Sequence, residues 1–277
     1  MSDALSRPTA SNRSEQQEIP LLRLSNVTRR FGGLVAVDNL SFSLHTGEIL
    51  GVIGPNGAGK STMVNLISGF SNPSAGTIFY QGQNINRVAA NRRTHLGIAR
   101  TFQMTQPFKG LDVRENVMVG AFFGRRGLGR NAAQRVADEV LEQVNLAHKA
   151  TFKGDQLTVA DRKRLEMARA LATNPRLLLL DEVMAGLTAP EVAQAVELIR
   201  RINSTGVTVL VIEHVVRAIM SLSHRVLVLH HGSKIAEDVP DQVLSDPRVI
   251  EAYLGERYAQ QRAQANNHAS SVEDVGL

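Results

Sequence analysis

The chain has 277 residues and a net charge of +5, because 31 Lys and Arg face 26 Asp and Glu. Hydrophobic residues make up 43% and charged residues 21%, which excludes collagen-like and wholly disordered chains. The absence of cysteine excludes disulfides and thiolate zinc sites and fits a reducing, cytoplasmic setting. The positive charge favours anionic partners: nucleic acid, phosphorylated ligands or an acidic membrane surface.

The chain lacks an apolar run that could span a membrane. Its longest, residues 117–123, is far shorter than the roughly 18 residues that a membrane helix needs. Residues 1–20 are polar and do not resemble a secretory signal, so we expect a disordered lead there, and a flexible tail over residues 258–277. The sequence predicts a protein that is soluble or attached to a membrane through a partner.

In chain order, the first predicted elements are strands. Residues 21–44 and 77–85 predict antiparallel hairpins. Three runs are apolar on both faces, as in strands that helices cover on both sides. These runs span residues 48–53, 177–180 and 207–212. Residues 226–229 predict a further strand, which turns at Gly232 into another.

Helices are predicted between these strands. Apolar residues over 188–202 follow helical spacing, and Thr188 with Glu191 forms a capping box. Residues 102–161 predict an inserted helical subdomain. This alternation of strands and helices predicts an α/β fold with a largely parallel sheet.

A glycine-rich loop gives the strongest local signal. Residues 54–62 match G-x-x-x-x-G-K-[ST] and lie after a predicted strand and before a helix predicted over residues 61–67. Such a loop points its N–H groups at a polyphosphate, with Lys60 reaching the β- and γ-phosphates and the Ser61 hydroxyl holding Mg²⁺. A glycine-rich turn that matches by chance is the alternative. The predicted binding residues are Gly54, Pro55, Asn56, Gly57, Ala58, Gly59, Lys60, Ser61 and Thr62.

Two carboxylates follow the predicted strand over residues 177–180. Asp181 and Glu182 come at the sheet edge where the phosphate loop also opens. We expect Asp181 to support Mg²⁺ and Glu182 to polarise an attacking water, with the two side chains pointing apart from an extended strand end. An ordinary charge pair at a strand end is the alternative.

The order and spacing of these motifs resemble the ATPase subunits of ABC transporters. Besides the loop and the carboxylates, the resemblance rests on Gln103 in Thr101-Phe-Gln, residues 157–161 and His214, and it covers residues 21–255. Three further segments resemble the ATPase subunits of branched-chain amino acid importers. These are residues 181–187, 211–214 and 252–255.

The resemblance implies a P-loop NTPase with a RecA-like core, an antiparallel β subdomain and the inserted helical subdomain, within an ABC ATPase domain over residues 21–257. It also implies roles for single residues. Gln103 would sense Mg²⁺ and the attacking water, His214 would donate a hydrogen bond to the γ-phosphate, and Phe31 would stack on adenine. A core or hairpin phenylalanine is the alternative for Phe31. We expect His230 and His231 to lie at a strand turn and not at a metal site.

The segment that usually reads Leu-Ser-Gly-Gly-Gln in this family departs from the pattern. Thr158 keeps a hydroxyl donor, but Ala160 carries a Cβ toward the ATP of the opposite subunit, and Asp161 replaces the glutamine. We expect Asp161 to cap a helix that begins at Arg162. The cations of residues 162–164 would face a phosphate of the partner-bound ATP or form a solvated basic face.

By this resemblance the chain is expected to bind and hydrolyse ATP with Mg²⁺ and so to power an importer for branched-chain or related amino acids. Its partners would be permease subunits, a second ATPase subunit that is identical or a paralogue, and indirectly an extracytoplasmic solute-binding protein. It would lie peripherally on the cytoplasmic face of the inner membrane and bind no nucleic acid. The alternatives are an ABC ATPase that acts on nucleic acid or ribosomes and a metabolic P-loop phosphotransferase. Nothing in the residues selects the solute.

Overall fold

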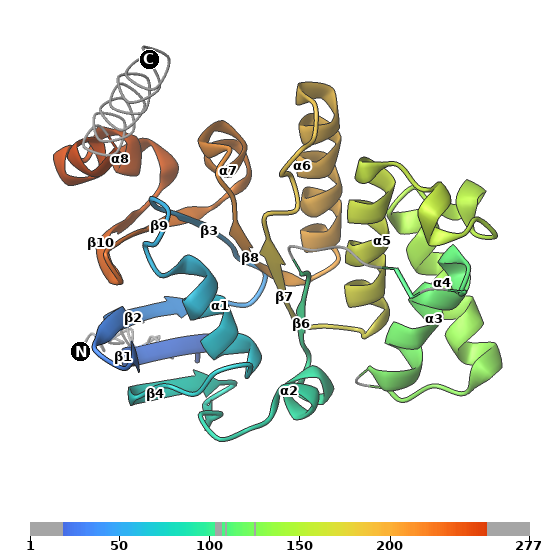
Figure 1. The fold of residues 1–277 in the computed structure, drawn as a ribbon, viewed down its shortest axis with the longest axis horizontal. Helices are drawn as coiled ribbons and strands as arrows, with labels where there is room; N and C mark the ends of the chain where they lie inside the picture. The colour runs from blue at the N-terminus through green and yellow to red at the C-terminus, as the bar shows by residue number, and fades with distance from the viewer. Residues whose placement is uncertain (1–18, 103–106, 109, 125, 254–277) are drawn as a thin grey trace, which may run out of the picture.

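The structure is a computed structural model that describes residues 19–102, 107–108, 110–124 and 126–253 (Figure 1). Nearly all of the lead expected over residues 1–20, and the whole of the tail expected over residues 258–277, lie outside these ranges. Gln103 also lies outside the described residues. No described helix combines the length and the apolar character that crossing a membrane requires.

Six strands of the described residues form the larger sheet, in the order β10-β9-β3-β8-β7-β6. They are β3 (Ile49–Ile53), β6 (Ile98–Arg100), β7 (Leu177–Asp181), β8 (Thr208–Ile212), β9 (Arg225–His230) and β10 (Ser233–Asp238). All neighbouring pairs are parallel except β9 and β10, which form a hairpin through Gly232. This topology confirms the predicted parallel sheet and its terminal turn.

The larger sheet is covered on both faces, as its apolar strands predicted. Every residue of β3, β7 and β8 is buried. In β3, Leu50 and Val52 join the core on one face, whereas Ile49 and Ile53 join the core on the other. The alternation of side chains along a strand therefore serves two separate hydrophobic cores.

A smaller antiparallel sheet lies on one side, in the order β2-β1-β4-β5. Its strands are β1 (Leu22–Phe31), β2 (Leu34–Leu44), β4 (Ala75–Tyr80) and β5 (Gln83–Asn84). Both predicted hairpins are confirmed, and β4 also pairs with β1. Helix α1 (Lys60–Ser68) shares one core with this sheet and with the larger sheet, and Figure 1 shows it beside both.

Three helices pack together at the β6 and β7 edge of the larger sheet (Figure 1): α3 (Val113–Phe123), α4 (Arg130–Gln143) and α5 (Val159–Ala172). The region expected to be helical, residues 102–161, contains α3, α4, the short turns η1 (Ala147–Lys149) and η2 (Gly154–Gln156), and the start of α5. The remaining helices are α2 (Ala90–Leu96), α6 (Ala189–Ser204), α7 (Val216–Leu222) and α8 (Pro240–Ser245). The predicted capping box of α6, from Thr188 and Glu191, is present.

Arg93 closes the C-terminal end of α1 from inside the protein. Its side chain is fully buried, and its guanidinium donates to the carbonyl oxygens of Leu66 and Ile67 at 2.6 and 2.8 Å. It also donates to the carbonyl oxygens of Ile85 and Val88, at 2.6 and 2.8 Å. Burial lowers the pKa of Arg93 to about 10, so the group stays charged at neutral pH. A cation at this place satisfies the carbonyl groups that a helix leaves unpaired at its end.

Candidate functional site

The glycine-rich loop connects β3 to α1 and depends on glycine at two close approaches. Gly54 and Gly59 have φ angles of 153° and 98°. A Cβ on Gly54 would lie 2.1 Å from the carbonyl oxygen of Leu229, and one on Gly59 would lie 2.4 Å from that of Ala36. The backbone can therefore curl as the motif predicted only without side chains at these two positions.

Lys60 bends back over this loop. Its side chain is 6% exposed, and its Nζ donates to the carbonyl oxygens of Gly54 at 2.6 Å and Pro55 at 2.8 Å. Next to it lies a cavity of about 290 Å³, which is lined by residues of the loop, of the start of β2 and of the edge of the larger sheet. The lining residues are Leu34, Val35, Ala36, Asn56, Gly57, Ala58, Gly59, Lys60, Ser61, Thr62, Glu182 and His214. The fold thus brings the predicted loop, Glu182 and His214 to one cavity.

Asp181 ends β7 and is 3% exposed. Its Oδ2 accepts a hydrogen bond from the guanidinium of Arg100 at 2.9 Å, while its backbone N–H donates to the Thr101 hydroxyl at 3.1 Å. Arg100 also donates to Asn65 Oδ1 of α1 at 2.5 Å. Arg100 could not be predicted from the sequence, because no local pattern distinguishes one arginine at the end of an edge strand.

Glu182 does not continue the strand, so the expected extended geometry is wrong. Its φ angle is 53°, in the left-handed region that costs a non-glycine residue roughly 1–3 kcal/mol. Its backbone N–H donates to the carbonyl oxygen of Ile212 at 3.0 Å, which fixes the turn against β8. Glu182 Oε1 then lies 2.8 Å from His214 Nε2. The side chains of Asp181 and Glu182 therefore differ in direction because of this turn, and not because side chains alternate along a strand.

Two buried ionisable residues lie behind Glu182, at a place that the sequence did not predict for either of them. Glu213 is 2% exposed and its Oε1 accepts the N–H of Met184 at 2.7 Å. Burial raises the pKa of Glu213 to about 7. Lys163 of α5 is 6% exposed and donates from Nζ to the carbonyl oxygen of Glu182 at 3.1 Å. Lys163 belongs to the cationic run of residues 162–164 and Glu213 to the segment of residues 211–214, but their burial at Glu182 follows only from the packing of α5 against the sheet.

Thr158, and not Asp161, caps the helix of the altered motif. Helix α5 begins at Val159, and the Thr158 hydroxyl accepts the N–H of Asp161 at 3.2 Å and donates to its Oδ2 at 2.8 Å. Lys149 donates to the same Oδ2 at 2.6 Å. Although burial opposes ionisation, the hydrogen bonds from Lys149 and Thr158 lower the pKa of Asp161. The prediction that Asp161 caps a helix starting at Arg162 is therefore wrong.

The three cations that follow bind within the chain. Arg162 donates to the carbonyl oxygen of Leu157 at 3.1 Å, and Arg164 donates to Gln194 Oε1 at 2.6 Å. Lys163, described above, is buried. A fully solvated basic face is therefore wrong for this segment.

Phe31 ends β1, pairs with Leu34 of β2 and is 48% exposed, so it is a hairpin residue, as one alternative had it, and not a core residue. The guanidinium of Arg29 lies 4.4 Å from its ring centroid, a cation–π contact. His230 and His231 lie at the turn between β9 and β10, as predicted, with ring centroids 4.1 Å apart. Among the described residues, no group of three or more His, Cys, Asp or Glu could hold a metal ion.

The cavity fits a magnesium-bound nucleotide. Mg²⁺ prefers oxygen ligands, and it is commonly held by one or two protein groups together with substrate phosphates. Ser61 lines the cavity, whereas Asp181, which directly precedes Glu182, is not among the lining residues and is paired with Arg100. Loop N–H groups and the Lys60 ammonium suit the phosphates. These groups suit a Mg²⁺ ion that is held mainly by the nucleotide phosphates and by only one or two protein ligands.

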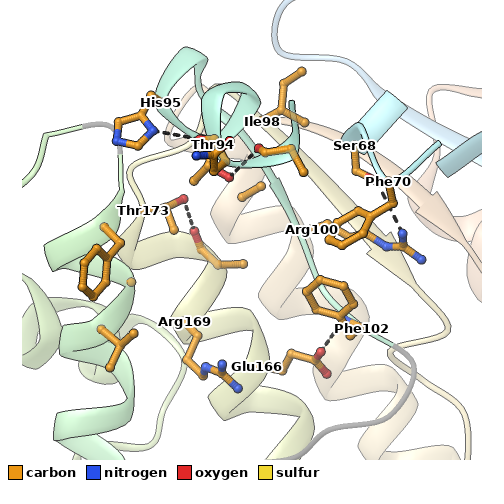
Figure 2. Close-up of a pocket in the computed structure, with 17 residues that line it drawn as sticks. Ser68, Phe70, Thr94, His95, Ile98, Arg100, Phe102, Glu166, Arg169 and Thr173 are labelled. Carbon is orange, nitrogen blue, oxygen red and sulfur yellow. Dashed lines mark hydrogen bonds between the residues drawn. The ribbon is translucent and has the colours of Figure 1, made fainter. Parts of the chain in front are cut away.

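A second cavity, of about 500 Å³, lies between β6, α2, α3 and α5 (Figure 2). Phe70, Phe102 and Phe123 line it and expose 61, 46 and 72% of their surface. Glu166 of α5 accepts the backbone N–H of Phe102 at its rim, and burial raises the pKa of Glu166. Exposed aromatic rings around a cavity are typical of a protein contact.

Known families match most of the chain. A profile described as ABC transporter matches residues 37–185, and one described as branched-chain amino acid ATP-binding cassette transporter matches residues 233–259. The high-affinity branched-chain amino acid transport ATP-binding protein LivG of Escherichia coli K12 is 37% identical over 86% of this chain and 98% of its own length. BraF of Pseudomonas aeruginosa, which carries the same description, is 36% identical over the same shares.

Solved structures of ATP-binding cassettes have the same fold as this chain. An ATP-binding cassette of an ABC transporter superposes with a TM-score of 0.79 at 31% identity, over 85% of this chain and 99% of its own. A dimeric cassette in a post-hydrolysis state with ADP and Pi gives a TM-score of 0.71 at 27% identity, over 79% of this chain and 98% of its own. With the phosphate loop, Glu182 and His214 at one cavity, these similarities show that the chain belongs to the ATP-binding cassette proteins of the ABC transporter family.

Proposed function

We propose that this chain is the ATP-binding and hydrolysing subunit of an importer for branched-chain or related amino acids. One observation carries the proposal: Glu182 and His214 are in contact at the cavity that Lys60 and Ser61 also line. Relatives at 36–37% identity are named as ATP-binding proteins of branched-chain amino acid transport. The ATPase domain would span residues 21–257.

Each part of the site has a task in hydrolysis. Loop N–H groups and Lys60 bind the phosphates, and Phe31 stacks on adenine from the end of β1. The Ser61 hydroxyl and the Asp181 carboxylate would hold Mg²⁺, which offsets negative charge on the phosphates. Glu182 polarises the attacking water and accepts its proton as a general base. Its contact with His214 fixes the direction in which the carboxylate points. His214 donates to the γ-phosphate, and Gln103 senses the metal and the water.

The chain would act as one of two ATPase subunits, the second being identical or a paralogue. In such a pair the segment of Thr158, Ala160 and Asp161 faces the nucleotide of the other subunit. The phenylalanine-lined cavity of Figure 2 would bind the permease. It lies between helices α3 and α5 and strand β6, which precedes Gln103 in the chain. That contact would keep the chain on the cytoplasmic face of the inner membrane, below an extracytoplasmic solute-binding protein.

Uptake of labelled solutes tests the function. Cells without this subunit should lose uptake of leucine, isoleucine, valine or a related amino acid, and the unaltered chain should restore it. The Glu182→Gln variant, expressed at the same level, should not restore it. Unchanged uptake of every solute, together with co-purification of RNA or ribosomes in place of permease subunits, would favour the alternative of a non-transport ABC ATPase.

A further inference from the structure

Lys163 makes a contact that joins two motifs of the site. It lies in α5, five residues after Thr158, and its Nζ donates to the backbone carbonyl oxygen of Glu182 at 3.1 Å. The side chain is 6% exposed. Burying an ammonium group is unfavourable unless the group is hydrogen-bonded, so a buried lysine directed at one carbonyl fixes the position of that carbonyl.

The carbonyl that Lys163 holds belongs to the turn with the left-handed backbone. Glu182 has a φ angle of 53°, and its N–H is held by the carbonyl oxygen of Ile212 at 3.0 Å. Lys163 binds the carbonyl oxygen of the same residue. Rotation of the peptide after Glu182 would break this second bond, so Lys163 holds the backbone of the residue whose Oε1 lies 2.8 Å from His214 Nε2.

Glu213 supports the same turn from the next strand. Its Oε1 accepts the N–H of Met184, two residues beyond Glu182, at 2.7 Å. The positive charge of Lys163 acts on Glu213 and partly offsets the effect of burial on its pKa. A cation from α5 and a carboxyl group from the end of β8 therefore hold the turn between them.

We propose that Lys163 is a positioning residue for hydrolysis, which holds the turn of Glu182 and ties it to the start of α5. The inference rests on the proposed function, in which Thr158 at that start faces the nucleotide of the second subunit. A displacement of α5 at one nucleotide would then reach the Glu182 carboxylate at the other.

Substitutions in the assembled transporter, with its partner subunit, test whether Lys163 positions Glu182 for hydrolysis. Lys163→Met removes the donor and keeps the length of the side chain, so kcat for ATP should fall roughly tenfold or more while KM for MgATP stays within about twofold. Lys163→Arg, which restores a donor, should recover most of kcat. Lys153→Met is a control: the exposed Lys153 also donates to a backbone carbonyl, of Gly110 at 3.0 Å, but far from Glu182 in the chain. It should change neither constant.

The melting temperature of each variant is measured first. If Lys163→Met does not fold, Lys163→Gln, which keeps a polar end, takes its place with the same expectation. An unchanged kcat in the folded variant, or a rise in KM that accounts for the whole loss, would overturn the inference. Glu182→Gln separates this from the proposed function: normal hydrolysis in that variant would remove the catalytic role of Glu182 itself.

Discussion

His214 Nε2 lies 2.8 Å from Glu182 Oε1, although 32 positions separate the two residues in the chain. They meet because β7 and β8 pair in parallel, with Asp181 opposite Ile212. Glu182 follows β7 by one residue and His214 follows β8 by two, so both arrive at the same sheet edge. The contact fixes where the carboxylate points before any nucleotide binds.

Glu182→Gln should separate ATP binding from hydrolysis. Glutamine keeps the size of the side chain and its contact with His214, but it cannot accept a proton and carries no charge. We expect turnover to fall about 10²-fold or more, with MgATP bound at least as tightly and the closed dimer longer-lived. Turnover and ATP-dependent dimerisation with the partner subunit measure both effects. Loss of ATP binding would instead assign the carboxylate to the metal.

Lys60→Ala should weaken MgATP binding on the order of tenfold or more, because it removes the cation at the phosphate loop. Equilibrium binding of a labelled ATP analogue measures the loss, and ATPase activity of the assembled transporter follows it. A melting curve is the control, since Lys60 also bridges the carbonyl oxygens of Gly54 and Pro55. An unchanged ATPase rate would contradict the assignment of the loop.

Thr158→Val should act mainly on the nucleotide of the other subunit. ATP affinity of the isolated chain should stay nearly unchanged, while turnover of the dimer falls. The structure adds a second effect, because the hydroxyl caps α5 and its loss destabilises the helix by about 1 kcal/mol. Thr158→Ser, which keeps the hydroxyl, is the control for both. An equal fall in isolated affinity and dimer turnover would mean that Thr158 acts at the chain's own nucleotide.

Arg93→Met should be among the most destabilising substitutions far from the nucleotide cavity. It removes the guanidinium from five carbonyl groups, of which that of Ile85 still accepts the N–H of Val88 at 3.0 Å, and each group left unsatisfied costs about 1–3 kcal/mol. We expect the free energy of unfolding, measured in denaturant, to fall by at least about 3 kcal/mol. The adjacent, exposed Arg92→Met is the matched control and should change it by less than about 0.5 kcal/mol.

Glu213 should make stability depend on pH. Burial raises its pKa from 4.5 to about 7, so between these values the folded chain keeps a proton that the unfolded chain has released. The stabilisation is complete below pH 4.5 and is lost as the pH rises through 7. Relative to Glu213→Gln, which does not titrate, the free energy of unfolding should fall by about 3 kcal/mol over this window. Parallel curves for the two proteins would show that Glu213 ionises normally.

Local patterns in the sequence were sufficient for the elements and for the phosphate loop. The loop could be predicted because its glycines, Lys60 and Ser61 all lie within one nine-residue motif, which can be recognised without the rest of the chain. The apolar runs predicted β3, β7 and β8 because burial on both faces favours apolar side chains at nearly every position, the exceptions being Asp181 and Thr208 at strand ends. Thr188 and Glu191 predicted the start of α6 for the same local reason.

Tertiary structure decided the arrangement around the carboxylates. Arg100 reaches Asp181, and Lys163 reaches the carbonyl oxygen of Glu182, across 81 and 19 positions of the chain. Neither spacing is a helical or strand period, so no local sequence pattern predicts either contact. The left-handed turn at Glu182 is likewise imposed from outside, by Ile212 on one side and by Lys163 on the other. A residue adopts such a backbone only where surrounding contacts outweigh its intrinsic preference, and those contacts exist only in the folded chain.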